Sequence, residues 1–287
     1  MIQDIQPYVL KNEYRNKSIK EDHYICICNE KSEVLLKTYK NKEGELRINL
    51  PKVNELGLDP VDIAKSCHFL FSIDKNDYFL LFDVRVEEKE GFTYKSLNEI
   101  RDMKPKRKVY ASAIAVQMNH WFDVNRFCGR CATPMSHHQG ERAFQCPNCK
   151  NTVYPTLSPS VIVAITHGDR ILLTKYAGRA HKRYALVAGY AEIGETLEET
   201  VRREVMEEVG LKVKNIRYYK SQPWPFSGSL LSGYFATLDG DDKITLQESE
   251  LSEGTWYHRD HIPTEASDIS LTNEMIEVFR AGKEYEF

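Results

Sequence analysis

The sequence has few of the features that mark secreted, membrane-bound or strongly basic proteins. Its 287 residues contain no apolar run approaching the ~18 residues that a membrane-spanning helix needs. The opening segment, MIQDIQPYVL, lacks the positive start and the long apolar core of a secretory signal. We therefore expect a cytoplasmic protein without membrane contact. The net charge is only −3, which does not indicate a general nucleic-acid binder.

One stretch, residues 189–211, predicts a helix with clear ends. It reads GYAEIGETLEETVRREVMEEVGL. Thr196 and Glu199 fit a capping box, in which each side chain bonds the other residue's backbone N–H. Gly210 suits the left-handed residue just past a helix end. An apolar stripe recurs every four residues, as expected of a core-facing side, at Val201, Val205 and Val209.

Three glutamates of this helix, Glu204, Glu207 and Glu208, share one face. Like charges at this spacing destabilise a helix by ~0.2–0.5 kcal/mol per pair, and a bound cation would reverse that effect. Glu208 lies about 20° from Val201 in projection, inside the apolar arc. A carboxylate there must be paired, protonated or metal-bound. Mg²⁺ and Mn²⁺ prefer such ligands and bridge them to phosphates; the alternative is a solvated acidic face.

A second pattern predicts a zinc site. Two C-x₂-C pairs are separated by fourteen residues, and they consist of Cys128, Cys131, Cys146 and Cys149. Four thiolates can close a tetrahedral Zn²⁺ site with no open position for chemistry. Two disulfides are the alternative, which a reducing cytoplasm disfavours. His137 and His138 lie between the pairs and could replace a ligand, but solvated loop residues are the simpler interpretation. The remaining thiols, Cys26, Cys28 and Cys67, are expected to be buried.

A third pattern is an aromatic, proline-rich segment, residues 221–229, with the sequence SQPWPFSGS. Its two prolines cannot both lie in a central strand. Trp224 and Phe226 offer flat faces for a base or a nicotinamide ring. Gln222 can bond ring edges and Ser229 can reach a phosphate. The alternative is a rigid aromatic corner that fills the core.

The three patterns, in this order, resemble the NADH pyrophosphatases of the Nudix hydrolase superfamily. The Nudix box is matched without a gap at Gly189, Glu195, Arg203, Glu204, Val205, Glu207, Glu208, Gly210 and Leu211. The resemblance implies an ion pair between Arg203 and Glu195. It implies catalytic residues and ligands for Mg²⁺ or Mn²⁺ at Glu204, Glu207, Glu208 and Glu250, with a further metal ligand in the backbone carbonyl of Ala188.

The resemblance also implies the substrate and the assembly. Substrate-binding positions would be Tyr154, Tyr190, Gln222, Pro223, Trp224, Pro225, Phe226, Ser227, Gly228 and Ser229. The implied reaction is hydrolysis of NAD(H) to AMP and nicotinamide mononucleotide, and removal of NAD caps from RNA 5′ ends, by a homodimer. Thr156 and Ser227 depart from the family pattern, which has Arg and Pro there. The alternatives are hydrolysis of another nucleoside diphosphate, such as ADP-ribose, and a non-catalytic zinc-ribbon module that binds nucleic acid.

The predicted organisation has three parts. Residues 1–124 form a small mixed α+β domain, residues 125–154 a zinc ribbon, and residues 155–287 a Nudix domain. By resemblance, the last is an α/β/α sandwich around a mixed sheet. Expected elements there are strands at 161–166, 171–174, 185–188 and 233–238 and a closing helix at 267–281. The dense basic run at 104–108 is either a solvated linker or a phosphate contact for a longer nucleic-acid substrate.

Overall fold

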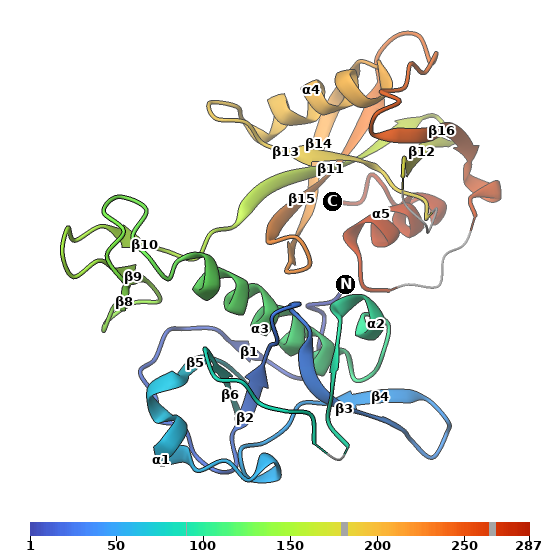
Figure 1. Cartoon of the computed structure of the whole chain (residues 1–287). Coiled ribbons are helices and arrows are strands. Elements are labelled where there is room, and N and C mark those ends of the chain that lie inside the picture. Colours follow the sequence, from blue (N-terminus) through green and yellow to red (C-terminus); the bar gives the residue numbers. More distant parts are fainter. Residues whose placement is uncertain (90, 179–182, 264–267) are drawn as a thin grey trace. The chain divides into compact units, whose positions relative to one another are not determined.

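The computed structural model describes residues 1–89, 91–178, 183–263 and 268–287. The chain divides into two compact units, Ile2–Thr156 and Leu157–Phe287, with Met1 joining the second (Figure 1). Each unit has its own hydrophobic cores. No helix within the described ranges is both long enough and apolar enough to span a bilayer.

The first unit begins with a mixed α+β region built on two small sheets. One has the strand order β1-β5-β6-β2, formed by Leu10–Lys11, Cys67–Ile73, Asn76–Leu81 and Tyr24–Ile27. The other has the order β4-β3-β7, formed by Leu46–Asn49, Val34–Lys40 and Thr93–Lys95. The helices are α1 (Pro60–Ile63), α2 (Leu97–Ile100) and α3 (Lys106–Val124). This region agrees with the predicted small mixed domain.

Helix α3 corrects the interpretation of the basic run. The helix begins inside the run at Lys106, and Lys108 is only 5% exposed. The Lys108 ammonium lies 3.1 Å from the ring centroid of Tyr24 and 5.1 Å from that of Tyr78, so aromatic faces replace water around it. The run is therefore not a solvated linker, and Lys108 does not face solvent as a phosphate contact would.

The first unit ends in the ribbon. Its three-stranded sheet has the order β10-β9-β8, formed by Thr152–Val153, Phe144–Gln145 and Ser136–His137. Each cysteine pair is followed by a residue in the left-handed region, Ala132 at φ 57° and Lys150 at φ 62°. The two turns also contain the equivalent backbone hydrogen bond: the Ala132 N–H donates to Cys128 O, and the Lys150 N–H donates to Cys146 O. The ribbon thus repeats one tight turn at both cysteine pairs.

The second unit is a six-stranded mixed sheet between two helices. Five strands have the order β14-β15-β11-β12-β16, and β13 also pairs with β11. These strands are β11 (Ser158–His167), β12 (Arg170–Tyr176), β13 (Val187–Tyr190), β14 (Val213–Trp224), β15 (Ser229–Leu238) and β16 (Leu251–His258). The β11–β15 pair is parallel and the other pairs are antiparallel.

The two helices of this unit cover opposite faces of the sheet. In β11, Val161, Val163 and Ile165 pack in the core that contains the α4 valines, whereas Ile162 and Ala164 pack with α5. Helix α4 spans Leu197–Val209 and α5 spans Leu271–Arg280. This alternation follows from the two-residue period of a strand. The predicted α/β/α sandwich around a mixed sheet is confirmed.

Two predicted elements differ from the observed ones. The strand expected at 185–188 is β13, which lies two residues later, because the pairing with β11 starts at Val187. The closing helix expected from Ser267 begins at Leu271, since Ser270 caps it by accepting a bond from the Asn273 N–H. Ser267 itself lies outside the described residues.

Candidate active site and zinc centre

Helix α4 has the ends that its sequence predicts. The Thr196 side chain accepts from the Glu199 N–H, and the Glu199 carboxylate accepts from the Thr196 N–H, which completes the capping box. Gly210 ends the helix at φ 69°, and a Cβ there would lie 2.9 Å from the Cβ of Thr245. The residue must therefore be glycine for its conformation and for its close neighbour.

Glu208 is the most unusual residue of the helix. It is 1% exposed, and among the described residues neither of its carboxylate oxygens has a partner at hydrogen-bond distance, although the nearby backbone of Ala188 opposes the rise of its pKa. Burial, followed by the charges of Glu204 and Glu250, raises the pKa of Glu208 to about 8. Buried carboxylates without partners are costly, and a cation offsets that cost directly. The predicted burial of Glu208 is confirmed, and its environment suits a metal ligand.

Arg203 organises the other carboxylates. Its guanidinium donates two hydrogen bonds to the Glu195 carboxylate, from Nε to Oε1 at 2.6 Å and from Nη2 to Oε2 at 2.9 Å. These bonds lower the pKa of Glu195 to about 2. The Arg203 Nη1 group also donates to Glu204 at 2.7 Å and to Glu207 at 2.9 Å. The ion pair implied by the resemblance is present, and the additional bonds to two proposed metal ligands were not predicted.

Strand β13 brings its backbone against the helix. A Cβ on Gly189 would lie 1.9 Å from the carboxyl carbon of Glu204, so only glycine lets the carboxylate approach. Ala188, the neighbouring residue, pairs with Ile162 of β11. Burial raises the pKa of Glu204, with Arg203 opposing the shift. The strand and the helix thus place a carboxylate against the backbone next to Ala188.

Glu250 comes from the turn before β16 and is exposed. Its charge contributes to the raised pKa of both Glu204 and Glu208, so it belongs to the same acidic cluster. Over the described ranges, however, only the four cysteines have their ligand atoms within 4.8 Å of one another. The carboxylates of the four glutamates are therefore less tightly grouped than the cysteine sulfurs, and Arg203 donates hydrogen bonds to two of them, Glu204 and Glu207.

The SQPWPF segment is a β-hairpin. β14 ends at Trp224 and β15 begins at Ser229, with a turn between them in which Gly228 has φ 69°. Pro223 pairs with Leu230, which is allowed because β14 is an edge strand. The rings of Trp224 and Phe226 are 4.6 Å apart at 40°. Both rings are only partly buried, which leaves them surface for a ligand.

The polar residues of the hairpin differ in their surroundings. Gln222 is fully buried, where its amide donates to Ile269 O at 2.8 Å and accepts from the Leu271 N–H at 2.7 Å. The Ser229 hydroxyl lies 2.8 Å from that of Ser227 and 3.4 Å from that of Tyr190, which is exposed. Tyr190 therefore lies beside the hairpin, whereas Gln222 connects the hairpin to the start of α5.

Tyr154, the remaining expected substrate contact, belongs to the first unit. Its side chain is exposed, and its hydroxyl donates to Glu141 of the ribbon at 2.7 Å. Its backbone carbonyl accepts from the Trp121 indole at 3.1 Å. The residue is thus fixed at both ends, and its role in substrate binding stays a prediction.

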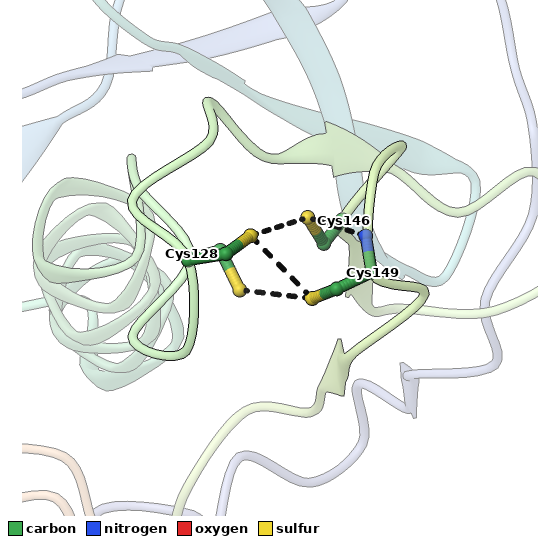
Figure 2. Close-up of side chains that lie close together, drawn as sticks. Cys128, Cys146 and Cys149 are labelled. Carbon is green, nitrogen blue, oxygen red and sulfur yellow. Dashed lines mark hydrogen bonds between the residues drawn. The ribbon is translucent and has the colours of Figure 1, made fainter.

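The four ribbon cysteines form a metal site. Sulfur–sulfur distances are 3.6 Å for Cys128–Cys149 and 3.5 Å for Cys131–Cys146 and Cys131–Cys149 (Figure 2). A disulfide needs about 2.05 Å, so the disulfide alternative is wrong and all seven cysteines are unpaired. Tetrahedral Zn²⁺ with bonds of about 2.3 Å separates its sulfurs by about 3.8 Å, close to the spacing observed.

Hydrogen bonds to sulfur support the same assignment. The N–H of Arg130 donates to Cys128 Sγ at 3.4 Å, and the N–H of Cys149 donates to Cys146 Sγ at 3.4 Å. The hydroxyl of Thr133, 3.3 Å from Cys131 Sγ, and the Thr133 backbone lower the pKa of Cys131 to about 6. Thiolates are the metal-binding form, so the first turn prepares Cys128 and Cys131 for a soft cation such as Zn²⁺. Burial and the neighbouring cysteines instead raise the pKa of Cys149 to about 11, a cost that a bound cation would offset.

One functional contact that the sequence analysis missed had a visible signal. Arg203 and Glu207 are four residues apart on the helix, which is the spacing of an ion pair. The contact between Arg203 and the neighbouring Glu204 has no such signal, because adjacent residues do not normally face each other on a helix. It depends on the rotamer that the bond to Glu195 imposes on Arg203.

Comparisons with known proteins identify the ribbon and the second unit. Residues 156–278 match the NUDIX domain, and residues 123–154 match the NADH pyrophosphatase zinc ribbon domain. The NAD-capped RNA hydrolase NudC of Chromobacterium violaceum is 41% identical over 172 residues, which are 60% of this chain and 64% of that protein. NudC of Salmonella paratyphi C is 41% identical over 162 residues, 56% of this chain and 63% of that protein.

A third relative aligns over more of the chain. NudC of Stutzerimonas stutzeri, also named an NAD-capped RNA hydrolase, is 36% identical over 237 residues, which are 83% of this chain and 81% of that protein. The chain spans less than two thirds of the Chromobacterium and Salmonella relatives. With its sandwich fold, its complete box and its cysteine ribbon, the chain belongs to the NADH pyrophosphatase (NudC-type) family of the Nudix superfamily.

Proposed function

We propose that this chain hydrolyses the pyrophosphate of NAD(H) to AMP and nicotinamide mononucleotide, and that it removes NAD caps from RNA 5′ ends by the same reaction. The observation that carries the hydrolase proposal is Glu208, a buried carboxylate without a partner inside a complete Nudix helix. A binding module would have no need to maintain such a residue. The acidic cluster therefore supports an enzyme over a non-catalytic module.

The proposed ligands of Mg²⁺ or Mn²⁺ are Glu204, Glu207, Glu208, Glu250 and the carbonyl of Ala188. Their hard oxygen donors suit these ions. A divalent cation bound there would neutralise phosphate oxygens and acidify the attacking water. Arg203 Nη1 bonds only one oxygen each of Glu204 and Glu207, so their second oxygens stay available to a cation, while the two bonds to Glu195 keep the guanidinium in place.

The remaining steps, proton transfer and binding of a base, are assigned to different residues of the chain. A carboxylate among Glu207, Glu208 and Glu250 would take the proton of the attacking water. The hairpin rings of Trp224 and Phe226 would hold one base of the dinucleotide by stacking, which leaves the diphosphate to the acidic cluster. This division explains why the recognition residues and the acidic residues come from different elements.

The choice of NAD(H) rests on two supports. The three relatives above are all named NAD-capped RNA hydrolases. The hairpin supplies exposed ring surface, and Tyr190 lies next to its Ser229. The remaining hairpin positions, Pro223, Pro225, Ser227 and Gly228, are proposed to shape the site. Gln222 would act by fixing the hairpin on α5.

The same family membership supports a homodimer acting in the cytoplasm, with one structural Zn²⁺ per chain. Seven unpaired cysteines are consistent with a reducing compartment. Metal analysis of the purified protein tests for one Zn²⁺ per chain, and its mass in solution tests for the homodimer.

The experiment is a product analysis on four substrates, NAD⁺, NADH, NAD-capped RNA and ADP-ribose, each with Mg²⁺ and with Mn²⁺. We expect AMP and nicotinamide mononucleotide from NAD⁺, AMP and reduced nicotinamide mononucleotide from NADH, and nicotinamide mononucleotide and 5′-monophosphate RNA from NAD-capped RNA. Faster turnover of ADP-ribose than of either dinucleotide would contradict the proposed specificity. No metal-dependent turnover of any of the four would favour the non-catalytic module.

A further inference from the structure

The first unit contains a cavity that the proposed reaction does not use. It has a volume of about 200 Å³ and is lined by segments around β5, by α3, by the chain before β2 and by the ribbon from His137 to Ala143. None of the glutamates of the Nudix box and none of the hairpin residues line it. It therefore offers a site separate from the acidic cluster.

The cavity wall carries more cationic than acidic side chains. Four cationic side chains line it, Arg15, Lys17, Lys65 and Arg142, against one acidic side chain, Glu141. The Glu141 carboxylate already accepts the hydroxyl of Tyr154. Two of the cations are paired with carboxylates outside the lining, Lys17 with Asp77 at 2.7 Å and Arg15 with Glu13 at 3.7 Å, which leaves Lys65 and Arg142. Lys65 is exposed and has no carboxylate within salt-bridge distance among the residues described. The wall thus attracts an anion.

Arg142 is the anchor of this positive wall. Its guanidinium donates to the side chain of Asn12 at 3.0 Å, to the Asn12 carbonyl at 3.3 Å and to the Leu70 carbonyl. All these acceptors are neutral, and within the described ranges no carboxylate reaches the guanidinium. Burial lowers the pKa of Arg142. A partly desolvated cation held only by neutral oxygens is stabilised by an incoming anion.

The cavity also has an aromatic surface. The imidazole rings of His68 and His137 stack with centroids 3.9 Å apart at 28°. His137 is an exposed residue as a whole, but its ring packs against Phe144 at 4.5 Å and Phe122 at 5.1 Å. Burial lowers the pKa of both histidines, so near neutral pH their rings are uncharged flat faces. Nucleobases stack on such rings.

We propose that this cavity binds one nucleotide, with its base on the His137–His68 pair and its phosphate near Arg142 and Lys65. A volume of about 200 Å³ is smaller than the ~300–1,000 Å³ of pockets for larger ligands, which favours a single nucleotide over a dinucleotide. The nucleotide can be free or can be one unit of a single-stranded RNA. The proposal does not depend on the hydrolase reaction.

Photoaffinity labelling of the full chain with 8-azidoadenosine 5′-monophosphate, followed by peptide mapping, tests this site. The zinc-loaded protein is used without added Mg²⁺ or Mn²⁺. We expect labelled peptides from residues 14–17, 64–70 or 137–143, protected by excess AMP. Because the readout is the position of the label, a second label in the hairpin would not obscure it, and loss of hydrolysis would not affect it.

Substitutions separate stacking from charge. His137→Ala should weaken labelling of these peptides by about 5- to 150-fold, the range for base–aromatic stacking, whereas His137→Phe keeps a ring and should retain it. Lys65→Gln should weaken labelling by removing a charge at the phosphate. Lys75→Gln is the matched control, since Lys75 is exposed in the same unit but does not line the cavity.

Competition identifies the source of the nucleotide. Protection by AMP alone indicates a free nucleotide, and protection by a 5′-hydroxyl hexaribonucleotide indicates single-stranded RNA; both support the site. Equal protection by inorganic phosphate would show an anion site without base recognition and would overturn the proposal. Label confined to residues 157–287, or no specific label, would overturn it as well.

Discussion

Glu208 is a buried carboxylate on a helix whose apolar stripe consists of Val201, Val205 and Val209. Its offset of about 20° from Val201 predicts this burial, and the structure confirms it at 1% exposure. The contacts of Arg203 with Glu204 and Glu207 could not be predicted as a set, because they require the Glu195 turn to fold back onto the helix. Helical periodicity gives the direction of a side chain but not the partners that come from distant segments.

Glu208→Gln should affect activity and stability in opposite directions. The amide keeps the volume and removes the charge, so we expect loss of most Mg²⁺-dependent NADH hydrolysis. The metal-free protein should be as stable as the wild type or more stable near neutral pH, because the raised pKa of Glu208 shows that burial penalises its charged form and Gln has no charged form. Steady-state kinetics and urea unfolding measure the two effects. Near-wild-type turnover at saturating Mg²⁺ would exclude this role for Glu208.

His68 should make the stability of the first unit depend on pH. Burial and the charge of His137 lower the pKa of His68 from 6.5 to about 4. Between these values the unfolded chain binds a proton and the folded chain does not, so stability is lost as the pH falls from 6.5 towards 4. His68→Phe should reduce the loss between pH 8 and pH 5 by about 2 kcal/mol.

Urea unfolding at the two pH values checks this difference, and His120→Phe on exposed α3 surface is the control. An unchanged pH dependence in His68→Phe would mean that His68 can be protonated in the folded protein without a penalty.

At the scale of elements, the aromatic hairpin shows which backbone features the sequence predicts and which it does not. The prolines at 223 and 225 predict irregular backbone, and the structure accommodates them in an edge strand and in the turn that follows it. The length of β14, from Val213 to Trp224, was not predicted, because its residues alternate irregularly between exposed and buried positions. Register shifts after Lys214 and Tyr218 explain that irregular pattern.

Trp224→Ala distinguishes a substrate contact from a core residue. If the indole stacks on the substrate, kcat/KM for NADH should fall by about 5- to 150-fold, corresponding to ~1–3 kcal/mol, in a folded protein. Trp224→Phe should retain most activity because it keeps an aromatic face. A variant that melts early while its folded fraction turns over NADH normally would place Trp224 in the core and remove it from the site.

At the scale of the whole molecule, the cysteine ribbon belongs to one compact unit and the acidic cluster to the other. The cysteine spacing was sufficient to predict the ribbon, because C-x₂-C turns determine their own local geometry. The cavity beside the ribbon could not be predicted, since its walls come from segments separated by more than one hundred residues, as in the Tyr14–His138 and Asn12–Arg142 contacts.

Cys146→Ser should reduce stability without changing the reaction products. Loss of a thiolate ligand weakens zinc binding, which is coupled to folding, so we expect a destabilisation of several kcal/mol, ~3 or more. Elemental analysis and thermal unfolding measure it, and Cys67→Ala, outside the quartet, should keep one Zn²⁺ per chain. Unchanged melting together with altered products would contradict a structural ribbon.

The bonds of Gln222 to Ile269 and Leu271 have a consequence for protein engineering. They make the aromatic hairpin and the first turn of α5 a single transplantable piece, although more than forty residues separate them in the chain. Moving residues 221–229 alone into another Nudix scaffold would leave a buried amide without its acceptor and its donor. A chimera designed to transfer dinucleotide preference should therefore carry residues 268–271 together with the hairpin.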